Sequence, residues 1–313
     1  SVLAVMFYHA EFKFFAGGFI GVDVFFVISG YLITQMVLGD FAKGTFSIQH
    51  FYERRVRRIL PALLAMLAVT APLAYGFLSA DLLVDYSVTL LGATWFSSNF
   101  VFWGEAGYFD RASEFKPLLH TWSLGVEEQF YLFFPGLLWV FYKLKWLIPG
   151  LALVVAASFW VAQLGLAQGA EWPFYMLISR AWELGLGAML AAALTHSRIS
   201  SFAVVGTWAE LLALAGLLAI LVPVVTFSKL TATPGPLLLF PTIGACVLIW
   251  LVPGTRFLRG LMSLKWMVGI GLISYSLYLW HQPVLVFSRI FVGEALNFEV
   301  RVLMLIGSLP LAL

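Results

Sequence analysis

Long apolar segments joined by short polar loops limit what this chain can fold into more than any other feature. A transmembrane helix needs about 20 such residues, whereas a transmembrane β-barrel would alternate apolar and polar residues. Hydrophobic residues make up 62% of the chain and charged residues only 11%, which excludes a water-soluble globule and a disordered chain. We therefore predict an all-α, polytopic membrane bundle of about ten transmembrane helices. The apolar runs lie at about 1–10, 19–38, 59–78, 82–102, 122–141, 146–166, 173–194, 203–224, 236–252, 266–288 and 300 onward.

The run 82–102 differs from the others because it contains Ser87, Thr89 and Asn99 and includes Asp85 near its start. Irregular backbone at membrane depth is tolerated only where it is buried in protein or lines a cavity. We interpret this run as a re-entrant segment that forms a wall of the functional site. The alternative is a full membrane span.

The distribution of lysine and arginine sets the expected orientation. With 82–102 re-entrant, most cations of the short loops fall on one side, which the positive-inside rule makes the cytoplasmic side. We expect loops 39–58 and 253–265 to face the cytoplasm and loop 103–118 to face outward. The cations counted include Arg198 inside and Arg111 outside. A net charge of only +2 gives no reason to expect nucleic-acid binding.

His9 and Asp23 are the first pair that could carry chemistry. They lie seven residues on either side of Ala16, in a stretch whose FFAGGF sequence predicts a hairpin turn between two helices. Such a turn would bring the imidazole and the carboxylate to similar depth. A neighbouring carboxylate raises the basicity of an imidazole and fixes its tautomer, as a general base acting on a hydroxyl requires. The alternative is an interfacial histidine and a structural aspartate.

A cluster of arginines begins a helix on the predicted inner side. The stretch FYERRVRRILPAL, residues 51–63, contains Arg54, Arg55, Arg57 and Arg58. Guanidinium groups bind phosphate bidentately, and a helix N-terminus adds a favourable dipole. The cluster therefore predicts a site for a phosphate-rich cytoplasmic ligand, such as a nucleotide-bearing cofactor. Two alternatives stay open: a topogenic role that holds the loop inside, and binding of anionic lipid head groups.

A third motif, PLLHTWSLGVEEQFYLFFP, carries His120 at the outer mouth of an apolar helix and Glu127 and Glu128 within it. Ionisable groups inside a membrane are costly unless they are paired or hydrated. The two glutamates point about 100° apart, so at most one faces a given cavity. Both could instead pair with another helix.

Arg180 and Glu183 lie three residues apart within one apolar run. That spacing places them on one helix face, and we predict a structural ion pair. The single cysteine, Cys246, lies in an apolar run, as expected of a small buried residue. With no cluster of cysteines and histidines, we expect no metal site.

The fourth motif, SYSLYLWHQP, places His281 at the outer end of its helix, among aromatic residues. An aromatic belt at the membrane interface explains such a composition, but aromatic faces beside polar groups also suit a sugar. Three of the five histidines would then reach the outer half, while the arginine cluster faces inward. The residues predicted to line an acceptor site or cavity are His120, Trp122, Tyr278, Trp280 and His281.

These motifs together resemble the acyltransferase-3 family of bacterial membrane O-acyltransferases. The matching strings are GGFIGVDVFFVISGYLIT, FYERRVRRILPAL, LLHTWSLGVEEQFYLFFP and SYSLYLWHQP, in the family's order. The sequences of these motifs are most similar to those of O-antigen acetylase-like members. In those proteins an extra helix and a periplasmic SGNH-type esterase domain follow the membrane part. Because the chain starts and stops inside apolar runs, we expect residues 1–313 to be the membrane domain of a longer protein.

The resemblance implies an acyl-CoA donor, usually acetyl-CoA, and a carbohydrate hydroxyl as acceptor, such as that of lipopolysaccharide O-antigen, at the bacterial inner membrane. It matches the family's essential histidine to His9 and its arginine motif to Arg55 and Arg58, with Arg54 and Arg57 as the alternative pairing. Together with burial, it also makes Glu127 or Glu128 an alternative to Asp23 as the partner of His9. The family's companion arginine would precede Ser1, and Gln282 stands where many relatives have tryptophan. The competing interpretation is a transporter or lipid-binding protein without covalent chemistry, since intramembrane charges suit that class too.

Overall fold

A computed structural model of the chain describes residues 1–105, 115–195, 206–293 and 298–312. Every regular element in these ranges is helical. The α-helices are α1 (Val2–His9), α2 (Gly21–Lys43), α3 (Ile48–Phe77), α4 (Ala80–Thr94), α5 (Ser98–Glu105), α6 (Thr121–Lys143), α7 (Leu147–Ala167), α8 (Trp172–Tyr175), α9 (Leu177–Thr195), α11 (Thr207–Thr226), α12 (Leu239–Leu251), α13 (Phe257–Met262), α14 (Lys265–Val292) and α15 (Phe298–Ala312). Short 3₁₀ turns are η1 (Lys13–Phe15), η2 (Gly18–Ile20), η4 (Pro236–Leu238) and η5 (Val252–Gly254).

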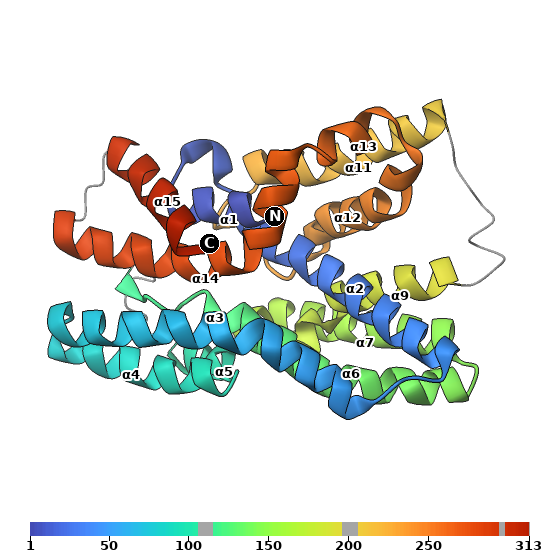
Figure 1. The fold of residues 1–313 in the computed structure, drawn as a ribbon, viewed down its shortest axis with the longest axis horizontal. Coiled ribbons are helices and arrows are strands. Elements are labelled where there is room, and N and C mark those ends of the chain that lie inside the picture. The colour runs from blue at the N-terminus through green and yellow to red at the C-terminus, as the bar shows by residue number, and fades with distance from the viewer. Residues whose placement is uncertain (106–114, 196–205, 294–297, 313) are drawn as a thin grey trace.

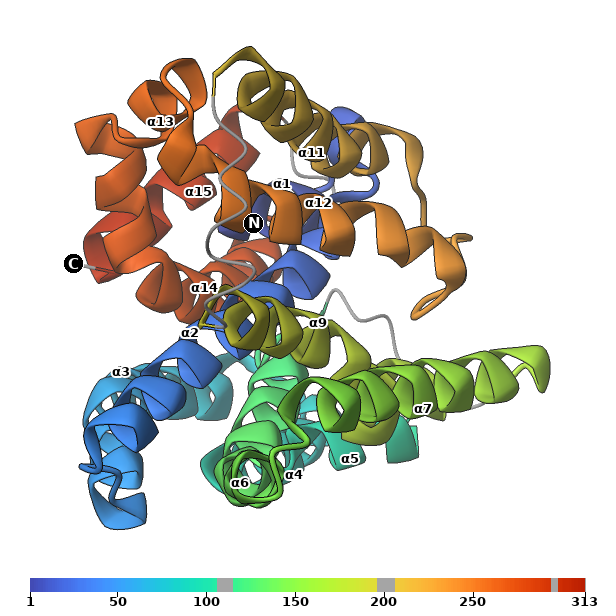
Figure 2. The ribbon, with the colours of Figure 1, turned by 90° about the vertical axis from the view of Figure 1, so that its right-hand side faces the viewer.

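The helices form two groups with a pair of helices between them. Figure 1 shows α3 to α7 in one group and α1 and α11 to α15 in the other, with α2 and α9 in the middle; the turned view in Figure 2 shows the same division. The largest buried hydrophobic cluster draws side chains from α2, α3, α6, α9 and α14. Apolar packing therefore connects the two groups across the central pair.

The helical class is as predicted, whereas the described ranges do not confirm the expected count of about ten membrane spans. Seven segments of the described ranges are long and apolar enough to cross a membrane: Gly18–Lys43, Ile48–Phe77, Leu147–Ala167, Leu177–Thr195, Thr207–Thr226, Pro236–Gly254 and Lys265–Val292. The difference comes from short or charged runs. Helices α1 and α15 have 8 and 15 residues, and α6 carries Glu127 and Glu128 inside its apolar run.

The run 82–102 is not one continuous helix. It is divided into α4, of 15 residues, and α5, of 8 residues, with a left-handed residue, Phe96, between them. Side chains satisfy the irregular backbone: Gln129 donates to the Phe96 carbonyl at 2.9 Å, and Asn99 donates to the Tyr175 carbonyl at 3.1 Å. A broken element of this kind is what a re-entrant segment requires. Its path relative to the membrane stays a prediction, and Arg111 and Arg198, used for the orientation, lie outside the described residues.

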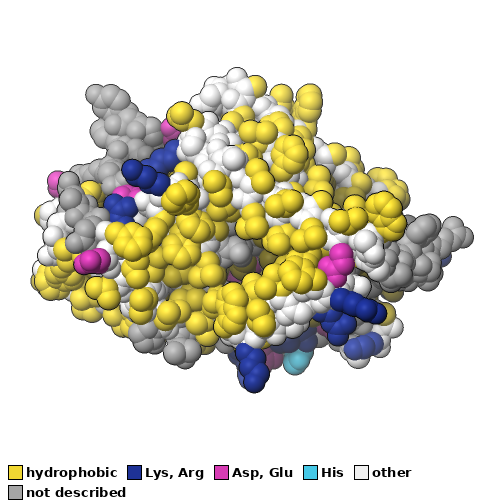
Figure 3. Space-filling model, turned by 90° about the horizontal axis from the view of Figure 1, so that it is seen from above, with side chains coloured by type: hydrophobic (Ala, Val, Ile, Leu, Met, Phe, Trp, Pro, Cys, Tyr) yellow, Lys and Arg dark blue, Asp and Glu magenta, His cyan; other side chains and the backbone are white. Residues whose placement is uncertain are grey.

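The outer surface is that of a protein surrounded by lipid. Large apolar side chains such as Trp95, Trp160, Trp208 and Leu272 are exposed. Figure 3 shows a face covered largely by hydrophobic side chains, with charged groups gathered toward its edges. Apolar patches of this extent would be unfavourable in water. The chain is a multi-pass membrane protein.

Helices α2 and α9 approach so closely that two glycines are required. A Cβ atom on Gly30 would lie 1.9 Å from the Leu184 carbonyl oxygen, and one on Gly187 would lie 1.9 Å from the Val27 carbonyl oxygen. Small residues let membrane helices pack backbone against backbone, where dispersion replaces the hydrophobic effect as the source of association. The central pair therefore depends on glycine at both positions.

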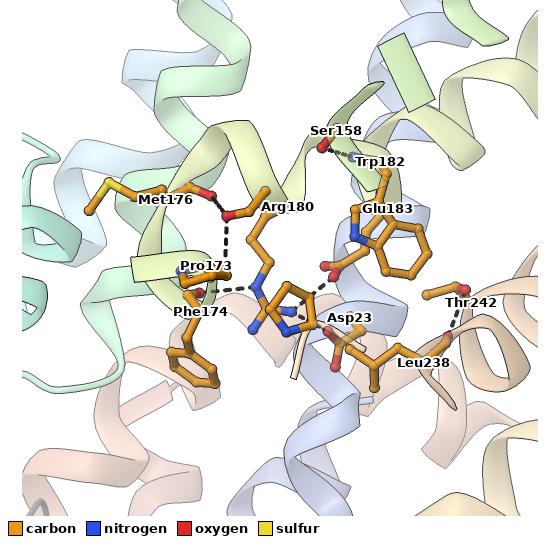
Figure 4. Close-up of polar contacts among 12 residues, drawn as sticks. Asp23, Ser158, Pro173, Phe174, Met176, Arg180, Trp182, Glu183, Leu238 and Thr242 are labelled. Atoms are coloured by element: carbon orange, nitrogen blue, oxygen red, sulfur yellow. Dashed lines mark hydrogen bonds and ion pairs between the residues drawn. The ribbon is translucent and has the colours of Figure 1, made fainter. Parts of the chain in front are cut away.

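Beside this contact lies a buried ion cluster. Arg180 Nη1 donates to Asp23 Oδ1 at 2.7 Å and to Glu183 Oε1 at 2.9 Å (Figure 4). Its Nε donates to the Phe174 carbonyl at 3.0 Å. The guanidinium also lies over the rings of Phe174 and Trp122, at 4.9 and 5.4 Å from their centroids. The two residues predicted as a pair are thus in contact, and Asp23 of α2 joins them.

The glycine contact yields a prediction with an internal control. Gly30→Ala should lower the unfolding temperature, because the added methyl group overlaps backbone and such overpacking costs roughly 1–3 kcal/mol. Gly39→Ala on the same helix meets open space and should be neutral or stabilising, since alanine favours helix by about 1 kcal/mol. Thermal unfolding of the purified protein in detergent measures both. Equal shifts for the two variants would contradict the close packing of α2 on α9.

The ion cluster yields a second prediction. Arg180→Met should destabilise the protein by roughly 3–5 kcal/mol, because it leaves two buried carboxylates without their cation. Asp23→Asn keeps the shape and leaves Arg180 paired with Glu183, so its effect should be smaller, about 1–3 kcal/mol. The two free energies of unfolding are compared in the same detergent. An Asp23→Asn variant as stable as the parent chain would show that Asp23 does not tie α2 to α9.

Candidate active site

Three histidines from distant parts of the chain meet at one place. His9 ends α1, His120 immediately precedes α6, and His281 lies within α14. His9 Nδ1 and His281 Nε2 are 2.9 Å apart, and the two rings are nearly parallel, with centroids 5.1 Å apart. His120 packs edge-on against His281 at a centroid distance of 5.4 Å. The sequence placed all three in the outer half but did not predict their contact.

The hydrogen bonds define which nitrogens carry protons when both rings are neutral. His281 Nδ1 lies 2.6 Å from the Tyr278 carbonyl oxygen, which can only accept, so this nitrogen is the donor. His281 Nε2 then has a lone pair and accepts from His9 Nδ1. His9 Nε2 is left with its own lone pair, assigned by the bonding network. The arrangement can supply a base or a nucleophile at that atom.

The predicted partnership between His9 and a carboxylate is wrong in its geometry. Among the described residues, Asp23, Glu127 and Glu128 make no hydrogen bond with His9, and His281 takes the place they were expected to fill. The segment after α1 is not a simple hairpin, because it passes through η1 and η2 before α2 begins. Asp23 then points to α9, where the buried Arg180 requires an anion.

Two arginines hold the end of the helix that carries His9. Arg289 donates to the His9 carbonyl at 3.1 Å and to Glu11 Oε1 at 3.0 Å. Arg301 donates to the carbonyls of Ala10 and Glu11 at 3.3 and 2.8 Å. The last carbonyls of a helix have no intrahelical partner and favour cations. Helix α14 therefore contacts His9 twice, through His281 at the side chain and Arg289 at the backbone.

Glu127 belongs to a second polar group, which lines a cavity. Its Oε1 accepts from Ser29 Oγ at 2.5 Å and from the Tyr131 hydroxyl. Of the two adjacent glutamates, only Glu127 lines the cavity, as the predicted difference of about 100° in direction requires. The lining residues are Ser1, Val2, Val5, Gly21, Val22, Phe25, Ser123, Leu124, Glu127, Ser274, Tyr275 and Tyr278. The cavity lies where α1, α2, α6 and α14 meet. None of the three histidines is among these lining residues, but Tyr278, which is, packs against the rings of His120 and His281.

The four arginines of α3 fall into two kinds. Arg54 and Arg57 each pair with a carboxylate, at 3.0 and 2.7 Å. Arg55 and Arg58 form no ion pair with the described residues, and they lie one turn apart on one face. The Arg55 guanidinium lies over the Tyr131 ring, 5.2 Å from its centroid, and its buried Nε has no hydrogen-bond partner. These two are the cations still available to an anionic ligand.

The predicted acceptor-side residues are only partly gathered. Tyr278 lines the cavity and donates to the His120 carbonyl at 3.0 Å. Trp122 lies elsewhere: it packs against Phe174, with ring centroids 4.6 Å apart, beneath the buried guanidinium of α9. Trp280 is buried in the main hydrophobic cluster. Both tryptophans are packing residues, because each is buried in the main hydrophobic cluster and neither lines the cavity.

Several residues of the site escaped the sequence analysis. Ser29 and Tyr131 lie inside quoted motifs, but their contact with Glu127 depends on how α2 packs on α6. Arg289 follows His281 by about two helical turns, and helical side chains lean toward the N-terminus of their helix. That spacing could have indicated that Arg289 lies near His281. Within the described ranges, no group of histidine, cysteine and acidic residues is arranged to hold a metal ion.

Comparison with known proteins identifies the same family as the sequence motifs. A family model described as "Acyltransferase domain", Acyl_transf_3, matches residues 1–313. The peptidoglycan O-acetyltransferase OatA of Listeria monocytogenes is 32% identical over 303 residues, which cover 91% of this chain and 48% of that protein. The putative membrane-bound transacylase BcsY of Komagataeibacter xylinus is 33% identical, covering 100% of this chain and 76% of that protein.

A third relative, the putative peptidoglycan O-acetyltransferase YrhL of Bacillus subtilis, is 34% identical over 304 residues, or 92% of this chain and 47% of that protein. The chain thus spans about half the length of the two relatives named for peptidoglycan. No solved structure matches the chain significantly. Because the family model covers every residue from 1 to 313, the chain belongs to the acyltransferase-3 family of membrane enzymes.

Proposed function

We propose that the chain is the membrane part of an O-acyltransferase that moves an acetyl group from cytoplasmic acetyl-CoA to a hydroxyl of a cell-surface carbohydrate. The observation that carries the proposal is the His9–His281 hydrogen bond, which leaves His9 Nε2 with a free lone pair. The proposed location is the bacterial inner membrane. Family membership favours acyl transfer over the competing transporter interpretation.

The donor would bind through the two arginines that have no ion pair. A nucleotide-bearing thioester carries several phosphate groups, which guanidinium groups bind in a bidentate manner. Arg55 has a buried Nε without a partner, and its guanidinium stacks on Tyr131, which bonds Glu127 at the cavity wall. A chain of contacts therefore connects the arginine helix to the cavity. This supports a path for the pantetheine arm from Arg55 toward the histidines.

His9 would act on the hydroxyl of the acceptor. Its Nε2 takes the hydroxyl proton as the oxygen attacks the acyl carbon, the carbon–sulfur bond breaks, and the proton passes to the departing thiolate. His281 Nε2 accepts the His9 Nδ1–H throughout and stabilises the imidazolium that forms. In the permitted variant, His9 Nε2 attacks the thioester carbon, the carbon–sulfur bond breaks and the thiolate leaves, so that His9 carries the acetyl group as an acyl-histidine. The acceptor oxygen then takes the acetyl group from Nε2, and the hydroxyl proton passes to the thiolate. Both routes begin from the same lone pair.

The acceptor class is a carbohydrate hydroxyl, and two polymers are candidates. The motif sequences resemble those of O-antigen acetylase-like proteins, whereas two relatives bear names that refer to peptidoglycan. The names of the relatives make peptidoglycan the stronger candidate. Mass spectrometry of both polymers, with and without the gene, distinguishes them: one acetyl mass lost from a defined sugar identifies the acceptor.

Substitution of the paired histidines tests the chemistry. His9→Ala should nearly abolish transfer, because general-base help contributes roughly 10²–10⁴-fold. His281→Phe keeps a planar ring but removes the acceptor of the His9 proton, so it should lower kcat by about 10²-fold or more. The measurement is transfer of radiolabelled acetyl from acetyl-CoA into polymer by membranes that contain the full-length protein. His50→Ala, an exposed histidine of α3, is the matched control. Full activity in His9→Ala would refute the mechanism.

Substitution of the arginines tests the proposed donor site. Arg55→Ala and Arg58→Ala should each raise the KM for acetyl-CoA by about 10- to 100-fold, the value of one to three kcal/mol of charged hydrogen bonding. Lysine should restore binding only partly, because it acts as a point charge. Arg57→Ala is the control on the same helix, since that side chain is exposed and already paired with Glu53. Variants that bind acetyl-CoA normally but insert wrongly in the membrane would favour the topogenic role.

A further inference from the structure

His120 is a buried imidazole without a partner. Its side chain is 1% exposed, and neither ring nitrogen makes a hydrogen bond. The carbonyl of Leu279 lies close to the ring but makes no hydrogen bond with it. Buried polar atoms are nearly always hydrogen-bonded, because an unmade bond leaves their lost hydration uncompensated. A neutral imidazole with one free N–H and one free lone pair therefore indicates a position completed by a ligand.

The surroundings hold this imidazole beside the reactive histidines. Its ring packs edge-on against both Tyr278 and His281, with centroid distances of 5.4 Å in each case. Its carbonyl accepts from the Tyr278 hydroxyl at 3.0 Å and from Ser123 Oγ at 3.2 Å. His120 is also the N-cap residue of α6, a helix of 23 residues. The positive end of that helix favours negative charge nearby.

The other donors of the cluster are already used. The His281 Nδ1–H is bonded to the Tyr278 carbonyl, the His9 Nδ1–H to His281, and the Tyr278 hydroxyl to the His120 carbonyl. Among the ring N–H groups of these three histidines, that of His120 is the one without an acceptor in the described chain. The atom it would meet must be an acceptor that is brought in by the substrate.

We propose that His120 donates a hydrogen bond to the carbonyl oxygen of the acyl group while transfer occurs. The inference rests on the proposed function and deepens it. The acyl group would approach from the cavity past Tyr278, which lines the cavity and contacts His120. When the hydroxyl oxygen adds to the acyl carbon, the carbon–oxygen π bond opens and its electron pair moves onto the carbonyl oxygen. When the pair returns, the carbon–sulfur bond breaks and the thiolate leaves with the proton taken by His9. A fixed donor in a dry site stabilises the oxyanion between these steps.

The test compares two donors, acetyl-CoA and its dithioester analogue, in which sulfur replaces the carbonyl oxygen. Sulfur is a weak hydrogen-bond acceptor, so an enzyme with an oxyanion donor should use the analogue less well than its intrinsic reactivity allows. Full-length protein in detergent is supplied with purified envelope glycan. Thiol release is measured for both donors, together with the acetyl ester formed from acetyl-CoA and the thioacetyl ester formed from the dithioester. The ratio of the two rates does not depend on how much of a variant is folded.

We expect His120→Ala to lower kcat with acetyl-CoA by about 10²–10³-fold while leaving its KM within about twofold, as loss of one oxyanion donor does elsewhere. The preference for acetyl-CoA over the dithioester should fall by a similar factor. His120→Gln, whose amide also donates, should restore part of both quantities. His50→Ala is the control for histidine loss elsewhere.

Three outcomes would overturn the inference. An unchanged preference in His120→Ala, with both donors slowed alike, would mean that the imidazole acts on something other than the carbonyl oxygen. A rise confined to the KM of the glycan would assign His120 to the acceptor. Full activity would remove it from the site. If the parent protein itself acetylates no glycan, the proposed function fails, and that result is distinct from the other three.

Discussion

The structure depends on the contact between α2 and α9, where a buried guanidinium faces two carboxylates beside a glycine-to-backbone contact. In lipid, apolar side chains give little reason for one helix to prefer another. A buried charge does, because leaving it alone is far more costly than pairing it. Arg180 therefore selects which face of α2 turns inward, and Gly30 and Gly187 set how near the two helices come. The two helix groups meet at this pair, so the placement of both follows from it.

The histidine cluster shows how such a frame supports chemistry. Helix α1 has only eight residues and could not hold a reactive side chain in place by itself. Helix α14 supplies the missing constraint, through His281 at the imidazole and Arg289 at the carbonyl of His9. A base must be held within a fraction of an ångström of its working position. Two contacts from one helix meet that requirement, whereas the carboxylate that the sequence suggested, Asp23, is held by Arg180 instead.

Polar groups are distributed along one path rather than scattered. Arg55 and Arg58, which form no ion pair with the described residues, lie near the start of α3. Glu127 lines the cavity, and Tyr278, another lining residue, packs against His120 and His281. Each group has a different electrostatic role. The arginine cations suit phosphates, and the imidazoles can move protons. The carboxylate of Glu127, which lines the cavity wall, is held by hydrogen bonds. This order supports a donor that enters from one side and an acceptor that is served from the other. His120, a buried imidazole without a hydrogen-bond partner among the described residues, lies at the end of this path, where the proposed substrate would supply the partner.

The class of protein follows from the amino-acid sequence alone. Apolar runs with few charges require helices in a membrane, and four motifs identified the family and proposed the histidines, arginines and glutamates of the candidate site. The contact of Arg180 with Glu183 was also predictable, because three residues along one helix fix that geometry. Which distant groups meet was decided by tertiary packing. Spacing along the chain suggested Asp23 for His9, but helix rotation and packing gave Asp23 to Arg180 and His281 to His9. Contacts between helices depend on how every helix is rotated about its own axis. That rotation is set by the packing of all the helices together and cannot be read from a short stretch of sequence.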